Sequence, residues 1–237
     1  MPQHYRQAFD VVAAGEHASI VDRRAEAPVH AEVWRRLPNG GVVICVVADD
    51  RPGLLSLISA SLAVEKMDVT AAQAYTRAVR AGGKREAVDF LWLRSGGGSA
   101  APIADNDAST VAGILHGLVT GQVALESVLR RVRPRPSSPP PGAPRVTFAK
   151  TLDGSQAVLT IATSDRPGLL LGITLALFRT GVQIIASEAT TKNGGVTDRF
   201  TIAEQDGSPL SPERCSAVEA GVVAAIESLG RAPQAGA

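Results

Sequence analysis

The sequence predicts an α+β protein with two repeated domains, each a four-stranded antiparallel sheet with two helices on one face. Three observations predict this architecture. The hexapeptide Asp-Arg-Pro-Gly-Leu-Leu occurs twice, at residues 50–55 and 165–170. Each copy follows a run of β-branched and small apolar residues and precedes apolar residues at helical spacing, as expected of a strand-to-helix turn. The copies lie 115 residues apart, and the residues around them match at the same offset, which indicates an internal repeat.

The repeat extends well beyond the hexapeptide. The offset of 115 maps Leu54, Leu55, Ile58 and Leu62 onto Leu169, Leu170, Ile173 and Leu177, and Val69, Gln73, Ala74 and Thr76 onto Ile184, Glu188, Ala189 and Thr191. Both helices that follow the hexapeptide therefore bury the same stripe. Farther on, Asp89 matches Asp198 at an offset of 109, so the repeats differ by six residues in the hairpin between. The tip of the first hairpin is 81–86, and 193–195 form a tighter second turn.

Each repeat begins with a short alternating strand and a turn into the strand before the hexapeptide. These leading strands are predicted at 30–36 and 145–150. The order is then strand, hexapeptide, helix, strand, hairpin, strand and helix, with no strand after the second helix. Because a hairpin makes the leading strand antiparallel to its neighbour, it can occupy the edge of a missing last strand. This predicts a permuted ferredoxin-like sheet. Alternatively, the strand at 145 completes the first domain.

The second helix of each repeat begins differently. Ser211 is an N-cap residue, Pro212 takes the first helical position and Glu213 adds an acid to the first turn. In the first repeat the helix starts near 107 and buries an apolar run. An amphipathic helix is expected at 9–24. The predicted boundaries are a helical N-terminal extension (1–29), domain 1 (30–132), a proline-rich linker (133–144), domain 2 (145–231) and a disordered tail (232–237).

The hexapeptide is the candidate functional element. Proline suits a first helical position, and the aspartate two residues earlier can accept hydrogen bonds from free amides. Glycine has no Cβ, so a carboxylate or phosphate can approach the helix start, where amides and the helix dipole favour an anion. The alternative interpretation is that the motif merely caps a helix.

Composition limits the possible partners. A formal net charge of +1 gives no general attraction to nucleic acid or to an anionic membrane. Two cysteines, Cys45 and Cys215, lie in different repeats, which argues against a disulfide framework or metal site. No signal peptide or membrane-spanning run is recognisable, so a soluble cytoplasmic protein is expected. His17 is interpreted as an ordinary helix-surface or partly packed histidine, and His116 as a structural or solvated side chain.

The two segments VVADDRPGLLSLISASLA and TIATSDRPGLLLGITLALFRTGVQIIASEATT, with VTDRFTI after the second, resemble tandem ACT domains, which are small regulatory modules that bind amino acids. The pair is similar to the C-terminal ACT pair of bacterial PII uridylyltransferases, which sense nitrogen through glutamine. The resemblance covers about residues 30–230. It implies ligand sites at the hexapeptide loops, at an interface between ACT domains. The implied lining residues are Asp50, Arg51, Gly53, Leu54, Asp165, Arg166, Gly168 and Leu169, with Gln73 and Glu188 as candidate readers of the ligand side chain.

Catalytic signatures of the parent enzymes are not found. The nucleotidyltransferase signature, Gly-Ser followed by two spaced aspartates, is absent, and adjacent Asp49 and Asp50 would leave a strand on opposite faces. The His-Asp pair of a metal-dependent phosphohydrolase is absent too. We therefore expect a non-catalytic amino-acid sensor without cofactor, with glutamine as the favoured effector. The alternative is a docking or dimerisation module, a homodimer through ACT sheets or a binder of a PII-type or nucleotidyltransferase partner.

Overall fold

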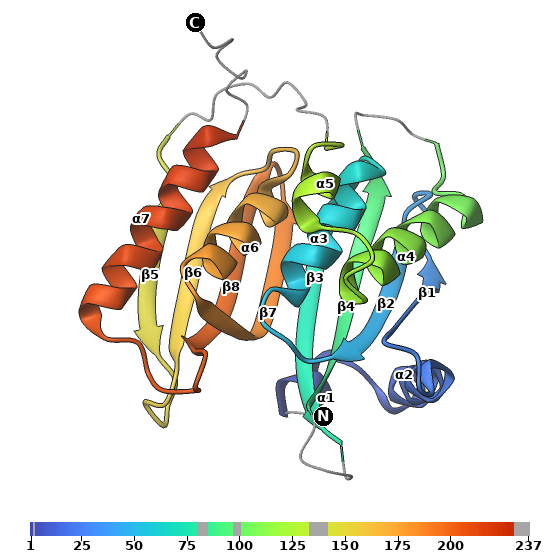
Figure 1. Cartoon of the computed structure of the whole chain (residues 1–237), viewed down its shortest axis with the longest axis horizontal. Coiled ribbons are helices and arrows are strands. Elements are labelled where there is room, and N and C mark those ends of the chain that lie inside the picture. The colour runs from blue at the N-terminus through green and yellow to red at the C-terminus, as the bar shows by residue number, and fades with distance from the viewer. Residues whose placement is uncertain (2, 80–84, 97–100, 133–141, 230–237) are drawn as a thin grey trace, which may run out of the picture.

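The computed structural model describes residues 1, 3–79, 85–96, 101–132 and 142–229. Its centre is an eight-stranded antiparallel sheet in the order β1-β2-β4-β3-β7-β8-β6-β5 (Figure 1). The strands are β1 (Val29–Arg36), β2 (Val42–Asp49), β3 (Met67–Ala78), β4 (Arg85–Ser95), β5 (Arg145–Lys150), β6 (Ala157–Ser164), β7 (Val182–Lys192) and β8 (Gly195–Glu204). The helices are α1 (Gln3–Ala8), α2 (Val11–Arg24), α3 (Leu54–Val64), α4 (Asp105–Val119), α5 (Leu125–Leu129), α6 (Leu169–Arg179) and α7 (Pro212–Ser228).

The leading strand of each repeat pairs within its own half of the sheet. β1 is antiparallel to β2, and β5 is antiparallel to β6. The alternative in which the strand at 145 completes the first half is therefore wrong. Each half has four strands, with two longer helices on one face, α3 and α4 or α6 and α7 (Figure 1). This arrangement is compatible with the predicted pair of permuted ferredoxin-like units.

The two halves meet edge to edge, where β3 pairs with β7. Gln73 lies directly opposite Glu188 in this pairing, and these are the residues that the 115-residue offset relates. The pairing is therefore centred on an approximate twofold axis, as in a symmetric dimer. α3 and α6 lie side by side above this junction (Figure 1). The hexapeptide loop that precedes each helix is thereby brought against the other half.

The two halves differ on the opposite face of the sheet. In the first half, α1 and α2 cover that face, and a second core forms between them and β2, β3 and β4. Its buried members are Tyr5, Ile20, Val43, Cys45, Val47, Tyr75, Val88 and Phe90. In the second half, the positions equivalent to Cys45 and Phe90 are Thr160 and Arg199. The polar residues on that face explain why it needs no helical cover.

Several local predictions are corrected or confirmed. The predicted helix at 9–24 begins at Val11, with Asp10 as its N-cap, and α1 and α5 were not predicted. Ser211 caps α7, followed by a proline in the first turn, as predicted.

His17 is not a surface or partly packed residue, because only 2% of it is exposed. Tyr5, Phe9, Trp34 and Phe90 surround its ring. His116 is exposed, which agrees with the solvated one of its two predicted alternatives.

Other predictions fall outside the described residues. These are most of the first hairpin tip (80–84), most of the proline-rich linker (133–141) and the tail from 230 onward. Within the described part of the chain, no helix is long and apolar enough to cross a membrane, and no group of three or more metal-binding side chains occurs.

Candidate functional site

The glycine of each hexapeptide lies at the start of a helix in a left-handed conformation. Gly53 has a φ of 80° and Gly168 a φ of 77°, and each is the N-cap residue. Glycine adopts this conformation without the penalty that a Cβ would impose. The helices begin at the following leucines, Leu54 and Leu169. The prediction that proline occupies the first helical position is therefore wrong, since it precedes the N-cap.

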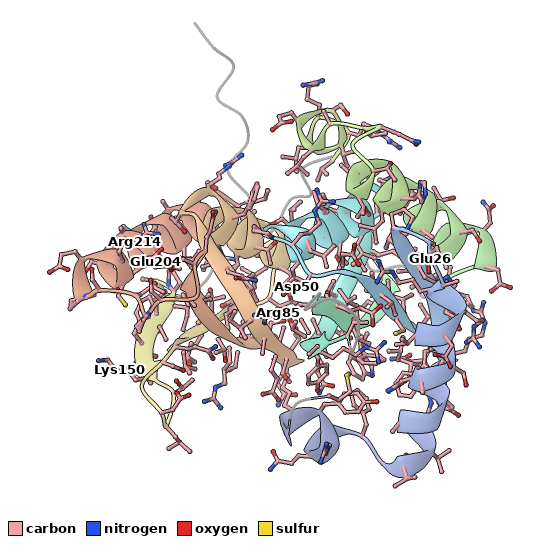
Figure 2. The ribbon with its side chains drawn as sticks, turned by 60° about the horizontal axis from the view of Figure 1, so that its bottom comes forward. Glu26, Asp50, Arg85, Lys150, Glu204 and Arg214 are labelled. Atoms are coloured by element: carbon pink, nitrogen blue, oxygen red, sulfur yellow. The ribbon has the colours of Figure 1, made fainter. Side chains whose placement is uncertain are left out.

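The aspartates that open the hexapeptides contact side chains of strands. The Asp50 carboxylate lies 3.3 Å from Arg85 Nε and accepts a 3.4 Å hydrogen bond from Gln183 Nε2. Figure 2 shows Asp50 and Arg85 next to one another, where β2 ends and β4 begins. Asp165 pairs with Arg94 of the first half at 3.2 Å. Each aspartate thus reaches the other half of the molecule, a role that the capping interpretation did not predict.

The arginines of the hexapeptides tie each loop to the second helix of its own half. Arg51 Nη1 donates to the Val119 carbonyl at 2.7 Å, and Arg166 Nη1 donates to the Ile226 carbonyl at 3.0 Å. Arg166 also donates to Thr163 Oγ1 at 3.1 Å. Val119 is the last residue of α4, so its carbonyl has no partner within the helix and Arg51 supplies one. The Ile226 carbonyl also accepts from the Leu229 amide at 3.2 Å, so Arg166 adds a second donor near the end of α7. Both guanidinium groups therefore have structural partners.

Gln73 and Glu188 do not lie with the hexapeptide loops. They face one another where β3 pairs with β7, and Tyr75 donates its hydroxyl to Gln73 Oε1 at 3.1 Å. Tyr75 belongs to the core beneath α1 and α2, and side chains two residues apart on a strand share a face. Gln73 therefore points away from α3 and α6. Neither Gln73 nor Glu188 lines the cavities at the two loops.

The loop of the first half is closed by an aromatic ring. A Cβ built on Gly53 would lie 2.7 Å from Phe178 Cδ2, so the ring fills the space that the missing side chain leaves. Phe178 comes from the end of α6, in the other half of the chain. The remaining cavity at this junction is only about 30 Å³. No amino acid fits in such a volume.

The loop of the second half is open. Nothing lies within 4 Å of a Cβ built on Gly168, and the adjoining cavity measures about 700 Å³. This is within the usual range of small-molecule sites. The offset of 115 places Ala63 where the first junction has Phe178, and Ala63 lines this cavity. The difference between a ring and a methyl group thus accounts for much of the difference between the junctions.

Two buried polar atoms in this cavity lack hydrogen-bond partners. They are Asp198 Oδ1 and Ser59 Oγ, from residues that are 2% and 3% exposed. Asp198 comes from β8 of the second half and Ser59 from α3 of the first. Among the described residues only two other buried side-chain atoms lack a partner, on His17 and Ser187. Unpaired buried polar atoms are rare because each costs free energy, so two at one cavity indicate a place for a polar ligand.

The sequence interpretation did not identify Asp198 or Ser59 as site residues. Asp198 was recognised only as a marker of the repeat. The sequence did contain a sign of its burial, which is its position in the alternating pattern of the strand. Asp198 lies two residues from Val196 and two from Phe200, on the same face, and all three side chains are buried. A carboxylate on the buried face of a strand is costly unless something pairs with it.

Burial shifts the titration of this carboxyl. Burial raises the pKa of Asp198 to about 7, and the like charge of Asp165 acts in the same direction. Burial likewise raises the pKa of Asp89, the equivalent residue at the closed junction, to about 8, with Asp50 as the like charge. At neutral pH the cavity therefore holds a carboxyl group poised between its two protonation states.

Comparison with known proteins places the chain beside a class of large bacterial enzymes. No family model matches it. It is 28% identical over 211 residues to the "Bifunctional uridylyltransferase/uridylyl-removing enzyme" of Rhodospirillum rubrum, covering 87% of the chain and 22% of that enzyme. Enzymes of the same name from Gluconobacter oxydans and Azospirillum brasilense are each 24% identical, covering 94% and 88% of the chain and 24% and 22% of those proteins. The chain is similar to one part of these enzymes. It spans less than a quarter of their length.

The resemblance to uridylyltransferases predicted from sequence is thereby confirmed over most of the chain. Among solved structures, a double ringed trimeric shell protein from the RMM microcompartment is 9% identical, with a TM-score of 0.25 over 84% of this chain and 93% of that one. A TM-score that low does not indicate a common fold.

Proposed function

We propose that this chain is a non-catalytic regulatory module of two ACT domains, and that it binds a free α-amino acid in the cavity beside Gly168. L-Glutamine is the favoured ligand, by resemblance to the regulatory pair of PII uridylyltransferases. The domain bounds of 30–132 and 145–231, the linker, the tail and the cytoplasmic location are predictions from the sequence that belong to this proposal. The same resemblance implies a role in the control of nitrogen metabolism, and the similarity to bifunctional uridylyltransferase/uridylyl-removing enzymes supports it.

The observation that carries this proposal is the set of groups around the cavity. The Leu169 amide already donates to the Arg166 carbonyl at 3.2 Å, but the next amides of the first turn of α6 have no partner within the helix, so the helix start favours a carboxylate. Asp198 Oδ1 and Ser59 Oγ add buried polar atoms that still need partners. A zwitterionic amino acid carries an anionic group and a cationic donor close together, and it therefore suits these two kinds of group. The cavity lies between the halves, so a ligand there would bridge them.

Calorimetric titration of the full chain with each of the twenty amino acids tests the proposal. We expect saturable binding of L-glutamine, or of a close relative, with one molecule bound per chain. The absence of a heat of binding with all twenty amino acids would refute amino-acid sensing. In that case light scattering and pull-down with a PII-type protein or a nucleotidyltransferase would examine the docking alternative.

A matched pair of glycine variants locates the site. Gly168→Asn places a side chain at the helix start, whereas Gly207→Asn places one in the turn before α7. Both glycines have positive φ, and nothing lies within 4 Å of a Cβ at either position. Asparagine tolerates the left-handed conformation better than most residues, so backbone strain is similar in the two variants. We expect Gly168→Asn to abolish binding and Gly207→Asn to preserve it; equal effects of the two would place the ligand elsewhere.

A further inference from the structure

We propose that Asp198 binds the ammonium group of the amino acid and loses a proton when it does so, which makes ligand binding dependent on pH around neutrality. This inference rests on the proposed function and specifies how the same site recognises its ligand. It assigns a role to a residue outside the hexapeptide, from β8.

The geometry selects Asp198 over the aspartate of the hexapeptide. Asp165 has a cationic partner already, since its carboxylate is 3.2 Å from Arg94 Nη2. Asp198 Oδ1 is buried at the cavity and has no partner. An incoming ammonium group can therefore pair with Asp198 without displacing an existing ion pair. The helix start beside Gly168 remains available for the ligand carboxylate.

The charged groups around Asp198 come from several elements. Asp165 belongs to the loop before α6, and its negative charge opposes ionisation of Asp198. Asp68 on β3 lies 3.9 Å from Arg94, which thus has carboxylates on two sides. Arg166 is directed to the Ile226 carbonyl and Thr163. Arg179, at the end of α6, also lines the cavity.

The proton balance of binding follows from this setting. The pKa of Asp198, raised to about 7 by burial, leaves the carboxyl about half protonated in the free protein at neutral pH. A ligand ammonium within hydrogen-bond distance stabilises the ionised form. The protonated fraction therefore transfers its proton to the buffer, and an ammonium–carboxylate pair remains. The affinity for the amino acid therefore falls with decreasing pH, because at low pH nearly every Asp198 carboxyl is protonated and must lose its proton before it can pair with the ligand.

The test is calorimetry with L-glutamine, followed by the other nineteen amino acids, in phosphate and in Tris at the same pH. The difference in heat between the buffers gives the number of protons released. We expect about half a proton per ligand at pH 7, and affinity about tenfold weaker at pH 6 than at pH 8. Asp198→Asn should release no proton and bind about ten- to a hundredfold more weakly, as expected for loss of a charge-assisted hydrogen bond.

Asp89→Asn is the matched control, because Asp89 is the equivalent buried carboxyl at the closed junction. It should leave affinity and proton release unchanged. Wild-type binding with no proton release, or equal proton release by Asp198→Asn, would overturn this inference while leaving the proposed function intact. No binding of any amino acid would overturn both. If Asp198→Asn fails to fold, the pH dependence of affinity in the wild-type protein tests the inference instead. No histidine or cysteine is among the residues lining the cavity, so neither of these residue types there would explain a change in affinity near pH 7.

Discussion

The same six residues produce a closed junction in the first half of the chain and an open one in the second. At both, glycine adopts a left-handed conformation, arginine donates to a carbonyl near the end of the second helix, and a buried aspartate lies on the neighbouring strand. What differs is the residue that the other half contributes, Phe178 at the first loop and Ala63 at the second. A motif therefore does not define a site by itself when a neighbouring domain supplies one wall.

The closed junction also has hydrogen bonds between the halves that the open junction lacks. At the closed junction, Gln183 donates to Asp50, and Ser56 Oγ donates to the Thr174 carbonyl at 2.9 Å. The equivalents of Gln183 and Ser56 at the open junction are Asp68 and Leu171, neither of which can reproduce the bond. Both junctions have a polar contact between the halves, since Arg94 pairs with Asp165 at the second, but among the described residues only the second leaves buried polar atoms, Ser59 Oγ and Asp198 Oδ1, without partners.

The largest effect is expected from transferring the closing ring to the open junction. Ala63→Phe should place an aromatic side chain beside Gly168, as Phe178 lies beside Gly53. We expect at least a hundredfold loss of amino-acid affinity, because the ring would occupy the space of the ligand. Thermal stability should be unchanged or higher, since the new side chain fills a cavity. Calorimetry and a melting curve measure both quantities. Unaltered affinity would show that the ligand binds away from this part of the cavity.

The reverse change should open the closed junction. Phe178→Ala removes the ring over Gly53 and leaves a space beside Asp89, so a second, weaker binding event is expected in the same titration. Phe178 is 39% exposed, and its removal should cost less than the about 3–5 kcal/mol of a fully buried phenylalanine. Urea unfolding measures that cost. If one molecule still binds per chain, features other than the ring keep the first junction closed.

The sequence predicted the repeat, the strand order within each half and the helices after the hexapeptides, because these depend on local patterns. It could not predict which loop is open. The closing residue lies 125 positions from Gly53, and its distance from the loop depends on the antiparallel pairing of β3 with β7. Gln73 and Glu188 were placed at the ligand by their matching positions, but they face away from α3 and α6. The alternating pattern of its strand places Asp198 on the buried face already in the sequence, but only the structure shows that this face borders a cavity.

The two halves also differ on the face of the sheet opposite α3 and α6, where, in the described part of the chain, only the first half is covered by helices, α1 and α2. Burial lowers the pKa of His17, in that cover, to about 4, and its Nδ1 lies 2.7 Å from the Tyr5 hydroxyl. The unfolded chain takes up a proton near pH 6.5 and the folded one only near pH 4. Stability should therefore fall as the pH drops through this window, by up to about 1.4 kcal/mol per pH unit.

His17→Gln should remove that dependence, because glutamine can still accept a hydrogen bond from Tyr5 but does not titrate. Urea unfolding of both proteins at pH 7, 6 and 5 measures the difference between their slopes, which cancels the contributions of other groups. Hydrogen exchange at pH 5 should increase in β1 and β2 before it does in β5 and β6. Parallel slopes for the two proteins would mean that His17 does not control acid stability.

The smallest expected effect is the difference between the arginines that the two loops have in common. Arg166 is 7% exposed and makes two hydrogen bonds, whereas Arg51 is exposed and makes one, to Val119. Arg166→Ala should lower the free energy of unfolding by about 1–2 kcal/mol, because it removes two hydrogen bonds from a buried side chain, while the Leu229 amide still donates to the Ile226 carbonyl. Arg51→Ala should cost less than about 1 kcal/mol, because water can replace the lost donor. Urea unfolding of both variants at pH 7 compares them directly. Equal losses would show that each arginine acts only through its bond to the helix end and that burial does not distinguish the two loops.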